Sequence, residues 1–460
     1  MRTVFISVFQ GFISRNILNT GVLDAFLDRG VRVILFVQKG KEAYYKDIYT
    51  DDRIVIEGCD LDRLSTKRDR SFRDIAELLL DTNTKRFHVQ KRYRAHGNRL
   101  RYILEHLFIR TFGSWNVCKK VFRWAEDRYN SNTGFDAYFE KYVPDHVFAT
   151  DIFGPNDVPL LKSARKHHVH SVGMVTSWDN PTTKTQLRII PDTILVQNNI
   201  LRDEMISLHA VDPKKLAVVG IAHYEYYKTY TPISREDFCK EMGINPKKKI
   251  ILVAPAGEKF ISTDWQIFEI LKKAYHDGEV PSDVHFLIRV HPMNKIKYGD
   301  FVPDEHFTIE EPGVTFEGVR EKGNELNKEG VNHIIDSIVH SAVVVNIVSS
   351  IVIDASVLGT PIVTVNFDGF EENVPITRSV KRFPAEENVA KMLATGGTQV
   401  VNSAEELIQA INEYLEHPGK DSEGRKRLVE RQCYKLDGKA PERIVEYVLS
   451  EKVAGRTDEK

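Results

Sequence analysis

The sequence predicts an α/β protein built from two doubly wound domains. Two separate series of Val- and Ile-rich runs alternate with helical patterns, which is typical of parallel strands that are buried on both faces. A polar segment separates the two series, and 460 residues are too many for one ordinary core. These observations favour two sheets in two domains.

The first series begins at Thr3. The run VFISVF reads as a strand, NILNTGVLDAFLDRG as a helix that ends at Gly30, and VRVILFV as the next strand. Further strand-like runs are HVFAT, SVGMVT, TILVQ and LAVVG. We therefore expect a first domain over residues 1–230.

The second series follows a polar, aromatic segment with two prolines, which predicts a linker over residues 231–248. Its strand-like runs are IILVAPAG, VHFLIRVHP, VVVNIVSS and PIVTVNF. We expect a second domain over 249–435 and a helix with a tail over 436–460. Ligands bind at the carboxyl ends of such strands, so a cleft between the domains is the expected site.

An insert over residues 60–140 interrupts the first series, and we expect it to be mostly helical. Between Lys85 and Arg128 it carries twelve Lys or Arg, three Asp or Glu, and interleaved aromatic residues. Such helices either lie on an anionic membrane surface or pack on the domain with the basic face in water. We expect no nucleic-acid partner, because no recognition module is evident.

Composition indicates a cytoplasmic protein. The net charge is −1, and the four cysteines are far apart without a CxxC pair, which fits a reducing compartment. No apolar run approaches the ~18 residues of a membrane span. The N-terminus has no small-residue cleavage site and reads as a strand rather than a signal peptide.

The stretch NIVSSIVIDASVLGTPIV reads as strand, turn, short helix and strand. Ser349 and Ser350 stand at the start of the helix, and their side-chain oxygens are expected to cap it. Backbone amides and the helix dipole favour an anion such as a diphosphate there, and the serine hydroxyls either donate to this anion or only cap the helix. Asp354, one turn later, either accepts hydrogen bonds from ribose or sugar hydroxyls or only complements the dipole.

Two other loops of the second domain support a diphosphate site. His291 ends the strand VHFLIRV, and a histidine there donates to a diphosphate, acts as an acid or base, or is structural. Arg289, on the same strand, is either part of the site or an internal salt-bridge partner. Gly257 allows close approach of the backbone, and Lys259 either neutralises a phosphate or is solvated.

Common nucleotide and metal motifs are absent from the sequence. There is no GxxxxGK[ST], and the first loop, VFQGFISRN, has one glycine instead of GxGxxG. Asp60 and Asp62 form a DxD, but the pattern of strands and helices around it is not that of the fold in which a DxD holds a metal. The histidines of RKHHVH lack a complementary ligand cluster. We expect no metal and no cofactor.

The sequence resembles GT-B glycosyltransferases. The first βαβ unit and TILVQNNILRDEMISLHAVDPKKLAVVGIAHYEYY look like the opening and hinge segments of these enzymes. RVHP and SSIVIDASVLGTPIV resemble donor-binding loops of bacterial CDP-glycerol glycerophosphotransferases and UDP-GlcNAc 2-epimerases, and DGKAPERIVEYVL resembles the former. The resemblance implies a GT-B fold of two Rossmann-like domains and a nucleotide-linked donor.

One loop departs from this resemblance. In the glycerophosphotransferases the first loop reads like SFHG, with a histidine thought to be the base, whereas this chain has SVFQG. Gln10 accepts no proton at neutral pH, so another residue is the base or the chemistry differs. Gln10 and Gly11 remain expected acceptor-side residues.

The expected base lies in the first domain, just after a strand. Asp151 in HVFATDIFGPND and Asp179 in SVGMVTSWDNPTTK meet this condition, although Asp-Asn-Pro is also an ordinary turn. Trp178 is placed to stack on a sugar ring. Arg15 and Asn16 either hold an acceptor or cap a helix.

His223, at the predicted hinge, is an expected donor contact, as in other GT-B chains. We expect an inverting, metal-independent glycosyltransferase that moves a sugar from a nucleotide diphosphate to a hydroxyl of a surface glycan or lipid-linked acceptor. Three alternatives stay open: transfer of glycerophosphate or polyol phosphate from a CDP-linked donor, a UDP-GlcNAc 2-epimerase, and a non-catalytic nucleotide-binding protein.

Overall fold

The computed structural model describes residues 1–258, 260–261, 263–291, 296–312, 327–347, 349–371 and 373–450. The chain forms two compact units. The first contains residues 1–226 and 431–450, and the second contains the described residues between 227 and 430. Within the described residues, no helix combines the length and the apolar character that a membrane span requires.

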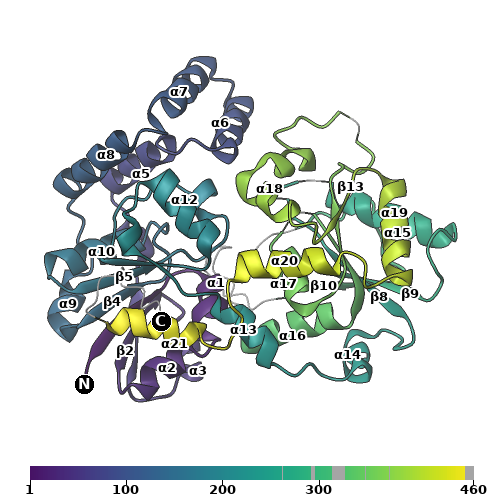
Figure 1. The fold of residues 1–460 in the computed structure, drawn as a ribbon, viewed down its shortest axis with the longest axis horizontal. Coiled ribbons are helices and arrows are strands. Elements are labelled where there is room, and N and C mark those ends of the chain that lie inside the picture. The colour runs from purple at the N-terminus through teal and green to yellow at the C-terminus, as the bar shows by residue number, and fades with distance from the viewer. Residues whose placement is uncertain are drawn as a thin grey trace. The chain divides into compact units, whose positions relative to one another are not determined.

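The first unit contains a parallel sheet of seven strands in the order β3-β2-β1-β4-β5-β6-β7. Figure 1 labels β2, β4 and β5 of this sheet. The strands are β1 (Thr3–Val8), β2 (Arg32–Gln38), β3 (Ile54–Cys59), β4 (His146–Ala149), β5 (His170–Met174), β6 (Thr193–Val196) and β7 (Leu216–Val218). The strands predicted in this half are confirmed, and β3 is an additional strand that the sequence reading did not include.

The alternation of side chains along β1 explains why both faces of this sheet are covered. Val4, Ile6 and Val8 enter one apolar core, while Phe5 enters another on the opposite face. The covering helices are α1 (Gly11–Ile13), a π-helix (Ser14–Leu18), α2 (Val22–Asp28), α3 (Glu42–Ile48), α9 (Asp136–Tyr142), α10 (Asp157–Lys166), α11 (Asn180–Thr183), α12 (Asn199–His209), a 3-10 turn (Pro213–Lys215), α13 (Ala222–Thr229, which runs into the second unit) and α21 (Ala440–Leu449).

The helix predicted to end at Gly30 is divided into two pieces. The π-helix ends at Leu18 and α2 begins at Val22. The Thr20 hydroxyl donates to the carbonyl of Ile17 (2.7 Å), which ends the first piece.

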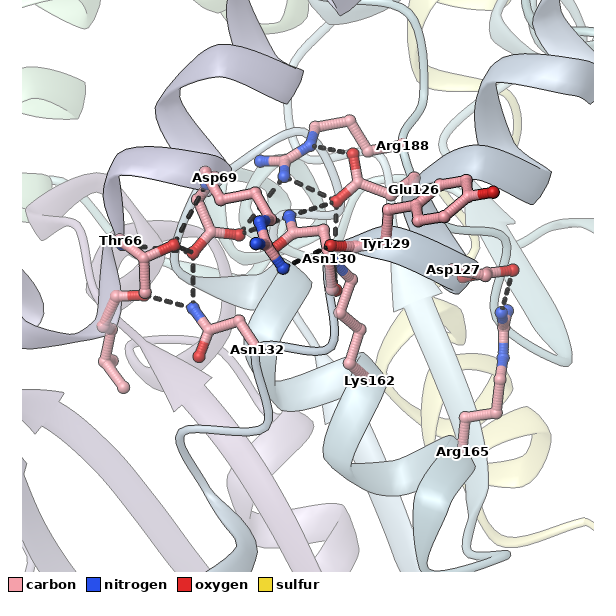
Figure 2. Close-up of polar contacts among 12 residues, drawn as sticks. Thr66, Asp69, Glu126, Asp127, Tyr129, Asn130, Asn132, Lys162, Arg165 and Arg188 are labelled. Carbon is pink, nitrogen blue, oxygen red and sulfur yellow. Dashed lines mark hydrogen bonds and ion pairs between the residues drawn. The ribbon is translucent and has the colours of Figure 1, made fainter.

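The insert is helical, as predicted, and is fixed to the unit by buried charges. It comprises α4 (Leu61–Leu64), α5 (Lys67–Leu78), α6 (Asn83–His96), α7 (Arg99–Phe112) and α8 (Asn116–Tyr129) before α9. Glu126 of α8 accepts from Lys162 of α10 (2.6 Å) and from Arg188 (2.7 Å), as Figure 2 shows. Asp69 of α5 lies 3.4 Å from the same Arg188. These two carboxylates and two cations are therefore buried together, where they neutralise each other's charge.

The second unit repeats the topology of the first without its last strand. Its parallel sheet has the order β10-β9-β8-β11-β12-β13. The strands are β8 (Lys249–Ala254), β9 (Val284–Arg289), β10 (Phe307–Glu310), β11 (Ser341–Asn346), β12 (Ile362–Val365) and β13 (Gln399–Val401). The helices are α14 (Arg235–Met242), α15 (Asp264–His276), α16 (Lys328–Val339), α17 (Ile351–Leu358), a 3-10 helix (Val380–Ala385), α18 (Glu387–Leu393), α19 (Ala404–Glu416) and α20 (Ser422–Cys433, whose end belongs to the first unit).

The predicted linker and the predicted C-terminal helix each lie within one of the two units. Residues 231–248, the predicted linker, lie in the second unit and include α14. The helix predicted after residue 435 is α21, and it packs in the first unit. Its Ala440 amide donates to Glu225 (2.8 Å), and Arg443 donates to the carbonyl of Val219 (2.9 Å).

Candidate functional site

Each sheet has one switch point, where neighbouring strands continue into connections that leave in opposite directions. In the first unit it lies between β1 and β4, and in the second between β8 and β11. Ligands of doubly wound sheets bind outside the carboxyl ends of these strands. We therefore expect the ligand site in the loops that follow these four strands.

At the first switch point Gln10 and Asp151 are hydrogen-bonded. Gln10 follows β1, and its Nε2 donates to Oδ2 of Asp151, just after β4, at 2.7 Å. Asp151 is 2% exposed, and this burial raises the pKa of its carboxyl. The Lys184 charge and the Gln10 hydrogen bond oppose this rise, and the Asp179 charge adds to it. A carboxylate with a raised pKa is a better proton acceptor near neutral pH.

A second buried carboxyl, Asp157 at the start of α10, lies beside Asp151. A Cβ placed on Gly154 would come within 3.1 Å of an oxygen of each carboxyl group. The Ser7 hydroxyl donates to Asp157, and burial together with the Asp151 charge raises the pKa of Asp157 well above its ordinary value. Two adjacent buried carboxyls do not ionise together easily, and the pKa of Asp157 is raised further than that of Asp151, so Asp157 holds its proton to higher pH.

The sequence reading missed both Asp157 and Ser7. Asp157 looks like an ordinary acidic residue in the first turn of a helix. Ser7 had a signal: it is the only polar side chain inside the run VFISV, and it lies on the apolar face opposite to Ile6. Ser7 also accepts from the Thr150 amide (2.9 Å), which fixes the backbone directly before Asp151.

Asp179 shapes its own loop. Its Oδ1 accepts from the Ser177 hydroxyl and its Oδ2 from Thr183 Oγ1 (3.0 Å), at the start of α11. The turn role that the sequence left open for Asp179 is therefore present. Asp179 also acts on Asp151 through its charge. Trp178 is half-buried beside it.

The structure brings Arg15 and His223 together within the first unit. Arg15 and Asn16 lie half-buried in the π-helix. His223 is buried in α13, its ring 4.1 Å from that of Tyr224. Burial and the Arg15 charge hold the pKa of His223 well below its ordinary value, so its ring is neutral. Gly11 is buried at the start of α1.

At the second switch point, the Asp264 carboxylate accepts hydrogen bonds from backbone amides of the loop after β8. Gly257 has a φ of 83°, a conformation that favours glycine. The amides of Ala256 and Gly257 each donate to the Asp264 carboxylate at 2.9 Å. Burial raises the pKa of Asp264 to about 6 despite both hydrogen bonds. The Gly257 amide thus has an internal acceptor, which sequence reasoning missed. Lys259 lies outside the described residues.

The predicted strand–turn–helix around Ser349 and Ser350 is present, but the expected cap by Ser350 is wrong. Ser350 has helical φ and ψ, and its side chain makes no capping hydrogen bond. Instead, the amide of Ile353 donates to the Ser350 carbonyl (2.8 Å) and that of Val352 to the Ser349 carbonyl (3.3 Å). Both serine side chains are half-buried.

Two buried polar groups flank this helix. Asp354 is buried, and its Oδ1 accepts from the Tyr227 hydroxyl (2.7 Å). Asn346, the last residue of β11, is completely buried, and neither its amide nitrogen nor its oxygen has a hydrogen-bond partner within the described ranges. An unsatisfied buried amide at a switch point is costly unless a ligand or water satisfies it. The sequence reading did not single out Asn346.

Other basic residues of this unit have different surroundings. His291 is exposed, two residues after β9. Arg289 is buried and pairs with Glu310, so the internal salt bridge considered for it is present. Arg382 is a buried cation that the sequence reading missed, and its Nη2 lies 3.3 Å from the carbonyl of Phe260, in the loop that contains Gly257.

The comparison with known families decides the identity of this chain. A model of the family described as CDP-glycerol:poly(glycerophosphate) glycerophosphotransferase matches residues 175–450. The chain belongs to this family. A search of curated protein sequences finds no match. The members of this family are transferases, so this chain is a transferase.

Solved structures share the fold of this glycerophosphotransferase-family chain. The S. aureus MnaA–UDP complex is 12% identical with a TM-score of 0.57, and all of both chains is covered. UDP-GlcNAc 2-epimerase from Neisseria meningitidis is 10% identical (TM-score 0.55; 98% of this chain and 100% of that chain). A glycosyltransferase from Rickettsia africae is 12% identical (TM-score 0.51; 98% and 99%). At these identities the similarity shows the two-domain GT-B fold alone, as predicted.

Proposed function

We propose that this enzyme transfers a group from a nucleotide-diphosphate donor to a hydroxyl of a surface glycan or lipid-linked acceptor, without a metal ion, and that Asp151 accepts the hydroxyl proton. The observation that carries the proposal is the buried Asp151 at the first switch point, oriented by Gln10 and with a raised pKa. Among the expected bases, Asp179 is less suited, because both its oxygens accept hydrogen bonds from its own loop.

Gln10 occupies the position from which an acceptor would reach Asp151. Gln10 is half-buried and donates to Oδ2, whereas Asp151 itself is nearly inaccessible. In the proposed mechanism the acceptor hydroxyl replaces the Gln10 amide as the donor to Oδ2 and then loses its proton to it. Asp157, protonated and held by Ser7, keeps the Asp151 loop in place.

The second unit is proposed to hold the donor. Ser349, Ser350 and the start of α17 would face the diphosphate, and the unsatisfied Asn346 amide would donate to and accept from the bound nucleotide. His291, Lys259 and the Gly257 loop complete the proposed donor side, with Asp354 fixing α17 through Tyr227. On the acceptor side we place Gly11, Arg15, Asn16 and Trp178. His223, which the structure puts beside Arg15, would join them.

Family membership favours a polyol phosphate as the transferred group. In that reaction the acceptor oxygen attacks the phosphorus that bears the polyol. The bond between this phosphorus and the bridging oxygen breaks, and CMP leaves with the bonding electrons. Asp151 takes the proton. The product is a phosphodiester between acceptor and polyol.

Sugar transfer is the second candidate, and Gln10 is the observation that favours it, because the histidine expected of glycerophosphate transfer is missing. Here the acceptor oxygen attacks the anomeric carbon with inversion, and a nucleoside diphosphate leaves. The two reactions therefore release different nucleotides.

The released nucleotide tests the proposal. The enzyme would be incubated with CDP-glycerol, CDP-ribitol or a panel of UDP-, GDP- and dTDP-sugars, with and without a glycan acceptor, and the nucleotides separated by anion exchange. CMP formed only with acceptor supports polyol-phosphate transfer, and a nucleoside diphosphate supports sugar transfer. Isomerised donor without acceptor would indicate an epimerase. Nucleotide binding without turnover of any donor would leave only the binding-protein alternative.

A further inference from the structure

The helix that follows Asp179, α11, is a single turn. It has four residues, Asn180–Thr183, and a helix of this length is not stable on its own in water. Asp179 is its N-cap residue and Lys184 its C-cap residue, so both charged side chains move with the helix. The position of α11 must therefore be set by groups outside it.

Two side chains from other elements bind carbonyl groups at the end of α11. The Thr82 hydroxyl, between α5 and α6 of the insert, donates to the Thr182 carbonyl at 2.8 Å. The same oxygen accepts from the Lys85 amide and so caps α6. The His209 ring donates from Nε2 to the Pro181 carbonyl, also at 2.8 Å. The last carbonyl groups of a helix lack partners inside the helix, so these two bonds satisfy them and hold α11 in place.

His209 is itself held in one orientation and one tautomer. Its Nδ1 accepts from the Leu187 amide at 3.2 Å, which leaves the proton on Nε2. The residue is completely buried, and burial lowers the pKa of the ring to about 3, so the ring stays neutral. Arg123 of α8 donates to the His209 carbonyl at 2.9 Å. The insert therefore reaches α11 directly through Thr82 and indirectly through Arg123 and His209.

The insert also binds the segment that continues from α11. The amide of Gln186 donates to the Ala76 carbonyl of α5 at 2.9 Å. Arg188 pairs with the buried Glu126 of α8, as Figure 2 shows. Together with the Thr82 contact, these bonds tie the whole segment to the insert, so a change in the insert is transmitted to α11.

Helix α11 acts on Asp151, the proposed proton acceptor, through its two end charges. The Lys184 charge lowers the pKa of the Asp151 carboxyl, and the Asp179 charge raises it by a smaller amount. The Asp157 carboxyl of α10 and the Gln10 amide after β1 lie beside the same group. The position of α11 consequently affects how readily Asp151 takes a proton.

Helix α11 also contains a buried donor that the protein does not satisfy. Asn180 is 2% exposed, and its Nδ2 has no hydrogen-bond partner in the part of the chain that the structure describes. Such a group is costly unless a ligand or water satisfies it. This feature is typical of an element that contacts a ligand, in agreement with the placement of Trp178 and Asp179 on the acceptor side.

We propose that the insert positions α11 for the reaction, with Thr82 and His209 as positioning residues. They act through the Thr182 and Pro181 carbonyl groups and touch no substrate. The inference rests on the proposed role of Asp151, but the attachment of α11 to the insert can be measured without turnover. The insert thereby contributes to proton transfer in the first unit.

Hydrogen exchange of the full-length protein tests the attachment. Thr82→Val keeps the shape of the side chain and removes the hydroxyl, so the amides of residues 180–187 should exchange at least about tenfold faster. Thr82→Ser restores the hydroxyl and should exchange like the parent. Asn98→Ala, which removes the cap of α7 in the same insert, is the matched control for the lost cap of α6 and should leave these amides unchanged. Unchanged exchange in Thr82→Val would overturn the proposal.

A second variant tests the path through His209. Arg123 donates to the carbonyl groups of His209 and Ala210, and Arg123→Lys keeps the charge but cannot bind both. The amides of residues 180–187 should again exchange faster than in the parent. This variant leaves Thr82 and the cap of α6 intact, so it decides the question even if Thr82→Val does not fold. Parent-like exchange in Arg123→Lys would refute the indirect path.

The pH–rate profile separates positioning from stability. In Thr82→Val the end charges of α11 act more weakly on Asp151, and the Lys184 effect is the larger. The pKa of Asp151 should therefore rise and the acidic limb move to higher pH, by less than about one unit, opposite to Asp179→Asn. Thr82→Ser should restore the parent profile, and nucleotide affinity by calorimetry should stay the same in both.

The outcomes distinguish this inference from the proposed function. Faster exchange in Thr82→Val with an unmoved acidic limb would show that the bonds only stabilise the fold, and positioning would be refuted. If the parent turns over no donor, the proposed transfer itself fails, and the exchange data alone decide whether the insert holds α11.

Discussion

The two sheets have the same strand order up to the sixth strand, and each buries a carboxyl group at its switch point, but the carboxyls have different partners. In the first unit Asp151 accepts from a side-chain amide and lies beside a second carboxyl, Asp157. In the second unit Asp264 accepts from two backbone amides of the loop after β8. A side-chain donor is replaceable by a substrate hydroxyl, whereas two backbone amides fix a loop. The same topology thus leaves a carboxyl with an exchangeable donor in the first unit, where we propose proton transfer, and a carboxyl that fixes a loop in the second.

The largest effect is expected at Asp151. Asp151→Asn should lower turnover about 100- to 10,000-fold, because the amide accepts no proton, and should leave nucleotide binding by the second unit unchanged. Turnover is measured by nucleotide release and binding by calorimetry. Asp179→Asn is the matched control. Full turnover in Asp151→Asn would show that Asp151 is not the proton acceptor and that the two switch points do not differ in this role.

Glu126 is a buried carboxylate of the first unit whose partners are cations. Glu126→Ala should lower the free energy of unfolding of this unit by about 3–5 kcal/mol, because Lys162 and Arg188 stay buried without their partner. Denaturant unfolding measures the loss. Asp277→Ala, which breaks an exposed pair with Lys273, should cost no more than about 0.5 kcal/mol.

The contribution of Asp264 to stability is expected to depend on pH. Its pKa is raised from 3.8 to about 6, so between these values the folded chain binds more protons at this site than the unfolded chain. The free energy of unfolding therefore falls as pH rises from 4 to 6, by about 2–3 kcal/mol from this group. Asp264→Asn removes the titration, so its stability relative to the parent should rise over the same window. A constant difference would show that Asp264 is not protonated in the folded state.

Ser350 tests the donor side. Ser350→Ala should weaken nucleotide binding about three- to tenfold, the loss of one or two hydrogen bonds to phosphate, and leave stability nearly unchanged because this side chain caps nothing. The control is Ser356→Ala, in the same helix, whose hydroxyl donates to the Val352 carbonyl. Unchanged affinity in Ser350→Ala would place the diphosphate elsewhere.

The smallest effect is expected from Asp179. The Asp179 charge raises the pKa of Asp151, so Asp179→Asn should lower that pKa and move the acidic limb of the pH–rate profile to lower pH by less than about one unit. Asparagine retains an acceptor for the Ser177 hydroxyl, so the loop is preserved. A limb that moves to higher pH would contradict this electrostatic link.

Much of the fold follows from local patterns. Long Val- and Ile-rich runs identified the central strands of both sheets, because parallel strands buried on both faces require them. Three strands at sheet edges were not predicted: β3 and β10, whose faces are partly exposed, and β13, which has three residues. These three strands lack the long Val- and Ile-rich runs from which the other strands were predicted.

The place of Asp151 in the chain was predictable, but the contacts between the residues of the candidate site were not. Asp151 was found because it follows a strand. Its neighbour Asp157 lies at the start of α10, where an acidic residue is ordinary, and only the fold brings Ser7 of β1 to Asp157. Likewise, no local pattern shows that Asp264 accepts a hydrogen bond from the Gly257 amide, or that the buried Asn346 side chain has no hydrogen-bond partner among the described residues. Both depend on which residues the fold brings together and buries.

The return of the chain to the first unit has a consequence for synthesis. The described residues of the second unit all lie between 227 and 430, whereas the first unit includes α21, whose Pro441 lies 3.6 Å from where a Cβ on Gly21 would be. On the ribosome the second unit can therefore complete its core while the first still lacks a helix. The N-terminal half must wait, with part of its apolar surface uncovered, until translation has passed residue 449, which reverses the usual order in which domains mature.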